Sequence, residues 1–246
     1  MTTFLLVHGS WHGGWCWSRV RRHLEGRGHT VLAPDLPGHG DDRTPIEAVT
    51  LSSYAERIVD VIDQKVEPGD GLVLVGHSMG GIVISEVAER VPDRVDLLVY
   101  LAAALLPDGE AMLDLSFADA GSLVARHLVL EPGGLAVTLD PAGIVDCFYA
   151  DCDPLDAVWA TTRLVPEAIA PLTEAVRVSP SRWGRVRRAY IVCEDDRAIS
   201  PAVQRRQCEE VGVDLAVTMA SAHSPFLSDA PALAGVLVHL AAGLGA

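Results

Sequence analysis

The stretch Leu72-Val73-Leu74-Val75-Gly76-His77-Ser78-Met79-Gly80 places a G-x-S-x-G motif directly after a continuous apolar run. The apolar run predicts a buried strand, and the pattern over Gly80–Val91 predicts a helix. A serine in so sharp a strand-to-helix turn has strained backbone angles, and glycine two positions to either side removes the clashes. We therefore expect the Ser78 hydroxyl to project above a sheet as a nucleophile. The alternative is a surface serine in a glycine-rich turn.

The loop after the first expected strand fits one half of an oxyanion site. Residues 8–14 read His-Gly-Ser-Trp-His-Gly-Gly, and the small residues let the backbone approach a substrate closely. The helix after the serine supplies the other half, because its N-terminal N–H groups favour developing negative charge. We expect the backbone N–H groups of Ser10 and Met79 to be the two donors. A metal pair of His8 and His12 would need a helix, which the glycines oppose, so no metal site is predicted.

A serine hydroxyl is a poor nucleophile at neutral pH without a base. In chains with this motif the order is serine, acid, histidine, each on a loop after a strand. Of the nine histidines, only His223 lies between the last strand candidate, Leu215–Met219, and the last predicted helix, Pro231–Leu240. We predict that His223 is the base, with an exposed loop histidine as the alternative. His77, adjacent to the serine in a tight turn, is expected to point away from it.

The acid is expected after the preceding strand candidate, Ala189–Cys193. That strand runs into three carboxylates at positions 194–196. We predict Asp196 as the acid, with Asp195 in reserve. A solvated acidic turn that caps the next helix is the non-catalytic alternative. Asp108 is a weaker candidate, because some folds of this class place the acid after an earlier strand.

Short apolar runs alternate with helical patterns along most of the chain. The strand candidates are Phe4–Val7, Thr30–Ala33, Leu72–Val75, Val95–Ala102, Ala189–Cys193 and Leu215–Met219. Continuous apolar strands alternating with helices predict an α/β fold, with about six mostly parallel strands and helices on both faces. The stretch 107–185 breaks this rhythm with short helical patterns at Pro154–Leu164 and Glu167–Val176, and no clear strand. We predict a small inserted helical cap there, within a single domain spanning residues 1–246.

Composition and charge limit the possible functions. The 246 residues are 49% hydrophobic and 21% charged, which is typical of a globular domain with a sizeable core. The net charge of −14 repels phosphate backbones and anionic lipid, so we expect neither nucleic acid nor membrane as a partner. The longest apolar run, Leu97–Leu106, is shorter than the roughly 18 residues that cross a bilayer.

The N-terminus and the cysteines indicate a compartment. Met1-Thr2-Thr3-Phe4 has neither a basic segment nor a long apolar segment, so no secretory signal is expected. The five cysteines are odd in number and lack C-x-x-C spacing, which is typical of reduced thiols. These features together predict a cytoplasmic protein.

These motifs resemble the α/β-hydrolase superfamily, and within it the branch of plant methylesterases (salicylate-binding esterase-like), hydroxynitrile lyases and bacterial pyrethroid-hydrolase-like esterases. The similarity spans nearly the whole chain. It is carried by Leu6–Trp15, Leu74–Gly81, Leu101–Asp108, Cys147–Cys152, Cys193–Ile199 and Ala222-His223. The resemblance implies a triad of Ser78, Asp196 and His223, the oxyanion donors already named, and a small helical cap that roofs the pocket.

The resemblance also favours one reaction. In the lyase members a threonine matches Gly9, and a lysine follows the catalytic histidine to hold cyanide. Here Gly9 leaves the oxyanion site open for a carbonyl oxygen, and Ser224 stands where the lysine would be. We therefore expect hydrolysis of a small, largely apolar carboxylic ester, without a cofactor, over cleavage of cyanohydrins.

The expected pocket contains aromatic side chains beside the oxyanion loop. Trp11 is the main candidate, and Phe148, Tyr149 and Trp159 from the cap are further candidates, with ordinary packing as their alternative. The same triad could instead serve thioester or lactone hydrolysis, acyl transfer or cyclisation, and a non-catalytic ligand-binding protein is a less favoured possibility. The expected partner is a small-molecule ester, and a homodimer is possible because related esterases often pair.

Overall fold

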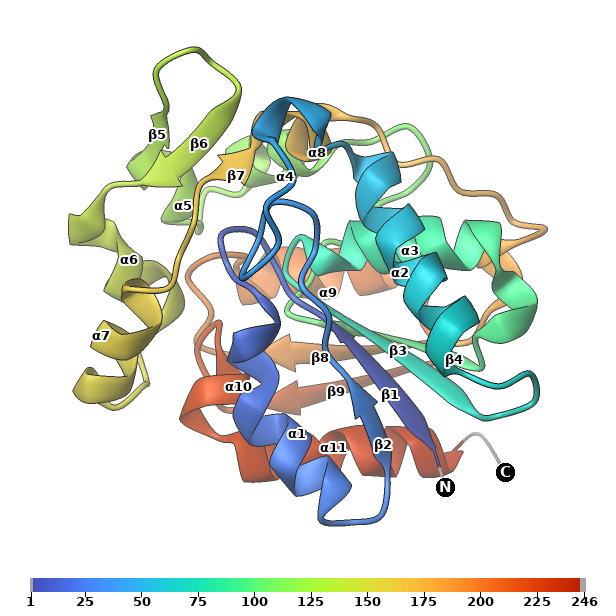
Figure 1. Ribbon diagram of the computed structural model, residues 1–246. Coiled ribbons are helices and arrows are strands. Elements are labelled where there is room, and N and C mark those ends of the chain that lie inside the picture. Colours follow the sequence, from blue (N-terminus) through green and yellow to red (C-terminus); the bar gives the residue numbers. More distant parts are fainter. Residues whose placement is uncertain (1, 244–246) are drawn as a thin grey trace.

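A six-stranded parallel sheet forms the centre of the protein (Figure 1), as the sequence predicts. The computed structural model describes residues 2–243. The strands lie in the order β2-β1-β3-β4-β8-β9. Their bounds are β1 (Thr3–Val7), β2 (Thr30–Leu32), β3 (Leu72–His77), β4 (Leu97–Leu101), β8 (Arg188–Cys193) and β9 (Leu215–Met219). Because the strands are parallel, the loops after β1, β3, β8 and β9 all emerge at one edge of the sheet.

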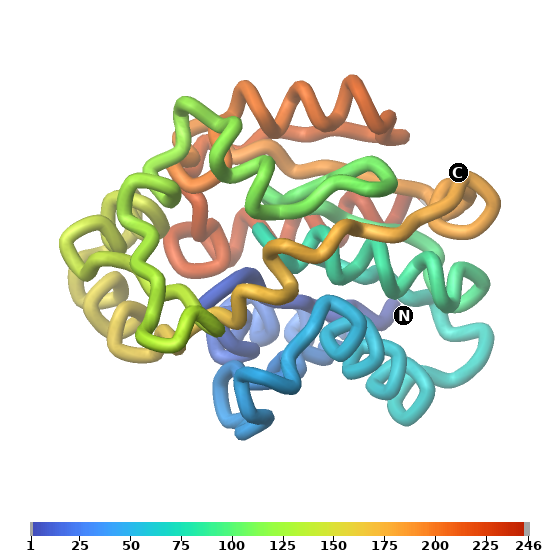
Figure 2. Tube along the Cα trace, turned by 90° about the horizontal axis from the view of Figure 1, so that it is seen from above, coloured from blue at the N-terminus to red at the C-terminus, as the bar shows by residue number. Residues whose placement is uncertain are grey.

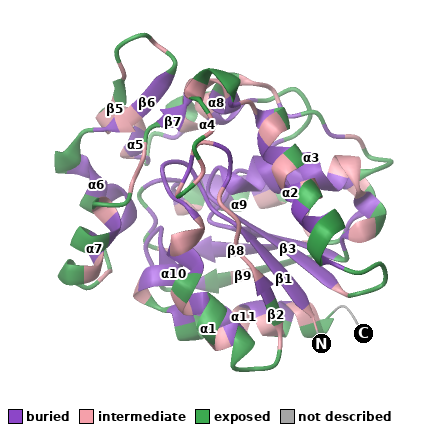
Figure 3. Cartoon of the chain, viewed as in Figure 1, coloured by how far each residue is buried: buried purple, intermediate pink, exposed green. Residues whose placement is uncertain are grey.

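Helices cover both faces of this sheet (Figure 1). On one side α1 (Ser18–Glu25) packs against α11 (Ala230–Ala242), and on the other α2 (Leu51–Lys65) packs against α3 (Gly80–Arg90). A further long helix, α9 (Pro201–Val211), packs against β8. The strands β1, β3 and β4 are buried along their whole length, which explains why they read as continuous apolar runs (Figure 3).

Local sequence signals determine where the helices begin. The Thr50 hydroxyl accepts a hydrogen bond from Ser53 N, and the Ser53 hydroxyl accepts one from Thr50 N, so α2 begins with a capping box. At α9, the Ser200 hydroxyl accepts from Val203 N and Pro201 occupies the first helical position. Short elements complete the fold: the 3-10 helices at Gly14–Trp17, Ile46–Ala48, Pro92–Arg94 and Trp183–Arg185, and α10 (Pro225–Ser228).

Most of residues 107–185 lie over the carboxyl edge of the sheet, as the chain traces in Figures 1 and 2 show, whereas the end of this segment runs back along α3, where Ser179 N and Trp183 N donate to Glu89. Their helices are α4 (Met112–Ala118), α5 (Val124–His127), α6 (Pro141–Phe148), α7 (Pro154–Thr161) and α8 (Ile169–Thr173). We call this segment the cap. It also contains a three-stranded antiparallel sheet of β5 (Leu128–Leu130), β6 (Ala136–Leu139) and β7 (Glu167–Ala168).

The expectation that the cap contains no strand is therefore wrong. The three strands have only three, four and two residues, too few for an alternating pattern to emerge from the sequence. The helix expected over Glu167–Val176 is also corrected, because its first two residues pair as β7 and only Ile169–Thr173 is helical. Among residues 2–243, no helix is long and apolar enough to span a membrane.

A buried ion pair fastens the cap to the sheet domain. Glu167 on β7 contacts His39 Nε2 at 3.2 Å and accepts a hydrogen bond from the Tyr54 hydroxyl at 2.7 Å. All three side chains are buried. Burial alone would lower the pKa of His39, but the charge and hydrogen bond of Glu167 outweigh that effect and raise this pKa above its ordinary value.

We predict that the stability due to this pair depends on pH. A histidine whose pKa is raised on folding stabilises the protein fully below its unfolded pKa of about 6.5, and the contribution disappears as pH rises through the folded value. Glu167→Gln should therefore reduce the free energy of unfolding by about 2 kcal/mol near pH 6, and by less near pH 9. Urea unfolding at several pH values measures the difference.

Tyr54→Phe is the matched control, because it removes a hydrogen bond to the same carboxylate without removing the ion pair. Burial, together with the neighbouring charge of Glu167, raises the pKa of Tyr54 well above its ordinary value, so its hydroxyl does not titrate between pH 6 and pH 9. Its cost in unfolding free energy should be constant between the two pH values. A pH-independent loss in Glu167→Gln would contradict the assignment of the pair.

Candidate active site

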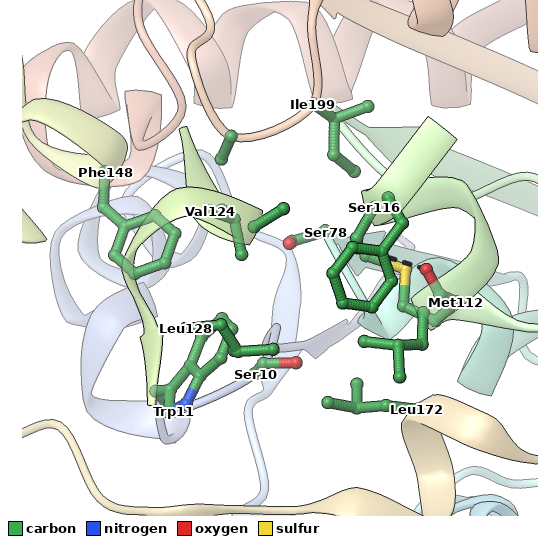
Figure 4. A pocket seen from close by; sticks show the side chains of 14 residues that line it. Ser10, Trp11, Ser78, Met112, Ser116, Val124, Leu128, Phe148, Leu172 and Ile199 are labelled. Carbon is green, nitrogen blue, oxygen red and sulfur yellow. Dashed lines mark hydrogen bonds between the residues drawn. The ribbon is translucent and has the colours of Figure 1, made fainter. Parts of the chain in front are cut away.

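Ser78 occupies a strained turn between β3 and α3. Its φ angle is +55°, in the left-handed region that side chains rarely adopt. A Cβ on Gly76 would lie 2.5 Å from Gly80 O, and a Cβ on Gly80 would lie 2.8 Å from His8 O. Glycine is therefore required on both sides of the serine, as the motif predicts. The Ser78 hydroxyl points into a cavity between the sheet and the cap (Figure 4).

Asp196 and His223, from the loops after β8 and β9, form a buried hydrogen-bonded pair. His223 Nδ1 lies 2.8 Å from Asp196 Oδ2, and both side chains are almost completely buried. Asp196 Oδ1 accepts hydrogen bonds from the N–H groups of Ala198 and Ile199 at 2.7 and 3.1 Å. The carboxylate is thus fixed, and its other oxygen faces the imidazole.

The other two acid candidates lie elsewhere. Asp195 is exposed, whereas Asp196 next to it is buried. The Asp108 carboxylate accepts a hydrogen bond from Val178 N at 3.1 Å, inside the cap segment. Only Asp196 contacts His223 among the three, so the geometry favours it as the acid.

Gln204 is a partner of this pair that sequence reasoning missed. From α9, its Nε2 donates to Asp196 Oδ2 at 2.9 Å and to Ile199 O at 2.7 Å, while its Oε1 accepts from Cys193 N at 3.0 Å. The side chain is fully buried. Its amide uses both donors and its oxygen, so Gln204 links the end of β8 to the carboxylate. A glutamine one turn into the helix that follows an acidic loop was the available signal.

His223 lies beside the serine turn, although the two residues are far apart in sequence. His77 Nε2 donates to the His223 backbone oxygen at 2.9 Å, and the two rings are 4.5 Å apart. Over the described range 2–243, no hydrogen bond joins the Ser78 hydroxyl to His223. Asp196 and His223 are therefore in direct contact. The link between His223 and the serine turn is the hydrogen bond from His77 to the His223 backbone.

The N–H groups of the two expected oxyanion donors are not engaged by other parts of the described chain, and only Ser10 of the two residues lines the cavity. Within the described part of the chain, neither Ser10 N–H nor Met79 N–H donates a hydrogen bond to another residue. Ser10 and Ser78 both line the cavity. A Cβ on Gly9 would lie 2.7 Å from Ser78 Cβ and 3.0 Å from His77 O, so the position next to the first donor has no room for a side chain.

Three further histidines around the site are held uncharged. Burial, with smaller contributions from neighbouring histidines, lowers the pKa values of His8 and His77 well below the ordinary range and that of His12 to about 4. His12 Nδ1 donates to Ser10 O at 2.8 Å, and its Nε2 accepts from the Tyr149 hydroxyl at 2.8 Å. His12 therefore connects the oxyanion loop to the cap.

The cavity has about 490 Å³ of empty space, part of it open to solvent, and no charged side chain lines it. Its lining residues are Ser10, Trp11, Ser78, Met112, Leu113, Ser116, Phe117, Val124, Ala125, Leu128, Phe148, Leu172, Ala198 and Ile199. Trp11 and Phe148 thus lie where the sequence suggests. The methyl, thioether and aromatic groups would exclude an ionic substrate group.

Two other aromatic candidates do not line this cavity. The Tyr149 hydroxyl is bonded to His12, as described above. Trp159 is 37% exposed on α7, packs edge-on against Trp15 and lies under the Arg163 guanidinium. Ordinary packing explains both side chains. Among the described residues, no group of three or more histidine, cysteine or acidic side chains could hold a metal ion.

We predict that Gln204→Leu slows the reaction of Ser78 with a fluorophosphonate, because the carboxylate that holds His223 is less firmly fixed. The change removes a donor from Asp196 and leaves Cys193 N without an acceptor, at about 1–3 kcal/mol of stability. The rate at which the folded variant is labelled, relative to the wild type, tests this.

Gln207→Leu is the matched control for Gln204→Leu. Gln207 is a buried glutamine on the same helix that bonds Leu105 N and Ala103 O instead of the acid. Its loss should lower stability by a similar amount without slowing the labelling of the folded protein. Equal labelling rates in the two folded variants would show that Gln204 acts only on folding.

Comparison with known proteins agrees with this geometry. The model of the alpha/beta hydrolase family matches residues 4–236. Salicylic acid-binding protein 2 of Nicotiana tabacum is 30% identical, over 97% of this chain and 96% of that protein. A chloroplastic methylesterase homologue of Arabidopsis thaliana is 31% identical to this chain. The match covers 97% of this chain but only 63% of the length of that relative.

A solved structure extends the similarity to three dimensions. The crystal structure of polyneuridine aldehyde esterase matches with a TM-score of 0.87 and 25% identity, covering 98% of this chain and 99% of that one. The resemblance to the methylesterase branch and the predicted fold class are both confirmed. The chain belongs to the alpha/beta hydrolase family.

Proposed function

We propose that the protein hydrolyses a small, largely apolar carboxylic ester through an acyl-enzyme on Ser78. The main support is that the strained serine opens into an uncharged cavity next to a buried His223–Asp196 pair. Relatives named as esterases support ester hydrolysis as the general activity, among them methyl jasmonate esterase 1 of Vitis vinifera and polyneuridine aldehyde esterase of Rauvolfia serpentina.

In the proposed reaction, His223 Nε2 takes the Ser78 proton as the serine oxygen bonds to the ester carbonyl carbon. Asp196 holds the Nδ1–H and stabilises the imidazolium that forms. The N–H groups of Ser10 and Met79 donate to the carbonyl oxygen as it becomes negative, at about 3 kcal/mol for each donor. The Ser78–His223 contact that this step requires is not a hydrogen bond in the described structure, and catalytic hydrogen bonds are often long without substrate and shorten when it binds.

The second half of the reaction releases the products. When the carbonyl re-forms, the ester C–O bond breaks and His223 gives its proton to the leaving alcohol. The same imidazole then removes a proton from water as the water oxygen bonds to the acyl carbon, and it gives that proton to Ser78 Oγ as the bond between the acyl carbon and Oγ breaks. The carboxylic acid leaves from an apolar cavity, where its charge is poorly solvated, so product release is favoured.

Other reactions of the same triad differ in the group that accepts the acyl chain. Thioester or lactone hydrolysis uses water, whereas acyl transfer or cyclisation uses another nucleophile. Cyanohydrin cleavage is disfavoured because Ser224 replaces the lysine expected in lyases and because Gly9 has no room for their threonine. A non-catalytic binding protein would need neither the strained serine nor the buried pair.

We predict that Ser78→Ala abolishes fluorophosphonate labelling and lowers the turnover of p-nitrophenyl acetate by at least about 10³-fold, because the nucleophile is lost. Ser85→Ala is the control. Ser85 is a buried serine on α3 that bonds Gly81 O and the Tyr100 hydroxyl, away from the cavity. Unchanged turnover in Ser78→Ala would refute the proposed function.

The acyl acceptor is identified with ¹⁸O-labelled water. Hydrolysis transfers the label into the released acid, and mass spectrometry detects it. An unlabelled acyl product joined to another nucleophile would instead favour the transferase alternative.

A further inference from the structure

Trp11 is held in a strained position by the cap. Its φ angle is +62°, in the left-handed region. The indole Nε1 donates to Val137 O on β6 at 3.0 Å, and the Trp11 backbone oxygen accepts from Val165 N at 3.0 Å. Only 7% of the side chain is exposed. Both ends of the residue are thus fixed by the cap, and the ring has one orientation.

Trp11 lines two cavities. One is the cavity above Ser78, where Trp11 and Phe148 lie along one side, with ring centroids 5.6 Å apart (Figure 4). The other is a hollow within the cap with about 580 Å³ of empty space, open on its outer side. We call it the outer hollow, and its lining is Trp11, Thr138, Leu139, Pro141, Ile144, Thr161, Leu164, Val165 and Pro166.

Trp11 is the one residue that lines both cavities, among the part of the chain described by the structure. The outer hollow carries no charged side chain, so its chemistry matches that of the cavity above the serine. Trp11 also follows Ser10, whose N–H group is the proposed oxyanion donor. A substrate chain that runs from the reacting carbonyl toward β6 would therefore meet the indole.

We propose that Trp11 is a specificity-determining residue that limits the length of the apolar chain of the ester. The outer hollow is then an extension of the substrate pocket that the indole closes. This inference rests on the proposed ester hydrolysis at Ser78. Its physical basis is that each methylene transferred from water to an apolar site favours binding by about fourfold, whereas a methylene stopped by a rigid wall gains nothing.

The experiment compares p-nitrophenyl esters from acetate to decanoate. In the wild type we expect kcat/KM to rise with chain length and then fall once the chain reaches the indole. Trp11→Ala should move this fall to longer chains and raise the ratio of the decanoate to the butyrate value at least tenfold. An unchanged length profile in Trp11→Ala would overturn the inference.

Two further variants separate the steric effect of the indole ring from the effect of its hydrogen bond to Val137 O. Trp11→Phe removes the hydrogen bond to Val137 O but keeps a ring, so it should retain the wild-type length profile. Trp11→Leu keeps an apolar side chain of intermediate size and should give an intermediate limit, which tests the inference even if the alanine variant folds poorly. If kcat/KM of Trp11→Phe fell at the same long chain length as that of Trp11→Ala, the hydrogen bond to Val137 O, and not the bulk of the ring, would set the limit.

Blocking the outer hollow tests where the chain goes. Thr161 lies at the end of α7 in the hollow and is partly exposed. Thr161→Trp should cancel the gain on decanoate in the Trp11→Ala background and leave the length profile of the wild type unchanged. Persistence of the gain in the double variant would exclude the outer hollow as the extension.

Two further measurements test which part of the ester carries the chain that meets Trp11, and whether turnover depends on Ser78. A matched series of alkyl acetates, in which only the alcohol lengthens, shows whether the acyl or the alcohol chain meets Trp11. Adding Ser78→Ala to Trp11→Ala should abolish turnover at every length. Turnover that survives without Ser78 would refute the proposed function, whereas turnover that depends on Ser78 but ignores Trp11 would refute only this inference.

Discussion

The carboxylate of Asp196 joins three separate segments of the chain. One oxygen accepts from Ala198 and Ile199 in its own loop, and the other contacts Gln204 on α9 and His223 after β9. A buried carboxylate without such partners costs several kcal/mol, so burial of this charge requires all three segments to be in place. The position of the imidazole therefore depends on helix and loop contacts as much as on the strand before it.

A second buried carboxylate ties the cap to the same loop. Asp119 accepts from both the backbone N–H and the hydroxyl of Ser200 at 2.7 Å, and the Ser122 hydroxyl donates to Ala198 O at 2.8 Å. Ser200 is also the residue that caps α9. The segment that shapes the cavity and the loop that carries the acid are thus bonded to each other, so a rearrangement of the cap would disturb the acid.

The sequence predicts the sheet and the order of its loops because the strands are buried on both faces. That topology alone brings Asp196 and His223 to one edge. It does not reveal Gln204, whose role depends on how α9 is rotated, nor the short cap strands, which pair through backbone groups that every sequence has. The sequence identifies aromatic residues in the cap but not the directions in which their side chains point. The prediction that Tyr149 and Trp159 line the cavity is therefore wrong.

The uncharged histidines around the site have a consequence for acid tolerance. A histidine whose pKa is lowered on folding stabilises the protein above its unfolded pKa of about 6.5, and this stability is lost as pH falls. His8, His12 and His77 all act in this direction, while His39 acts in the opposite one. Below about pH 6.5 the unfolded chain therefore binds more protons at His8, His12 and His77 than the folded protein does, and the free energy of unfolding falls as the medium becomes more acidic. Acid thus weakens the fold at the residues that surround the serine turn and the oxyanion loop.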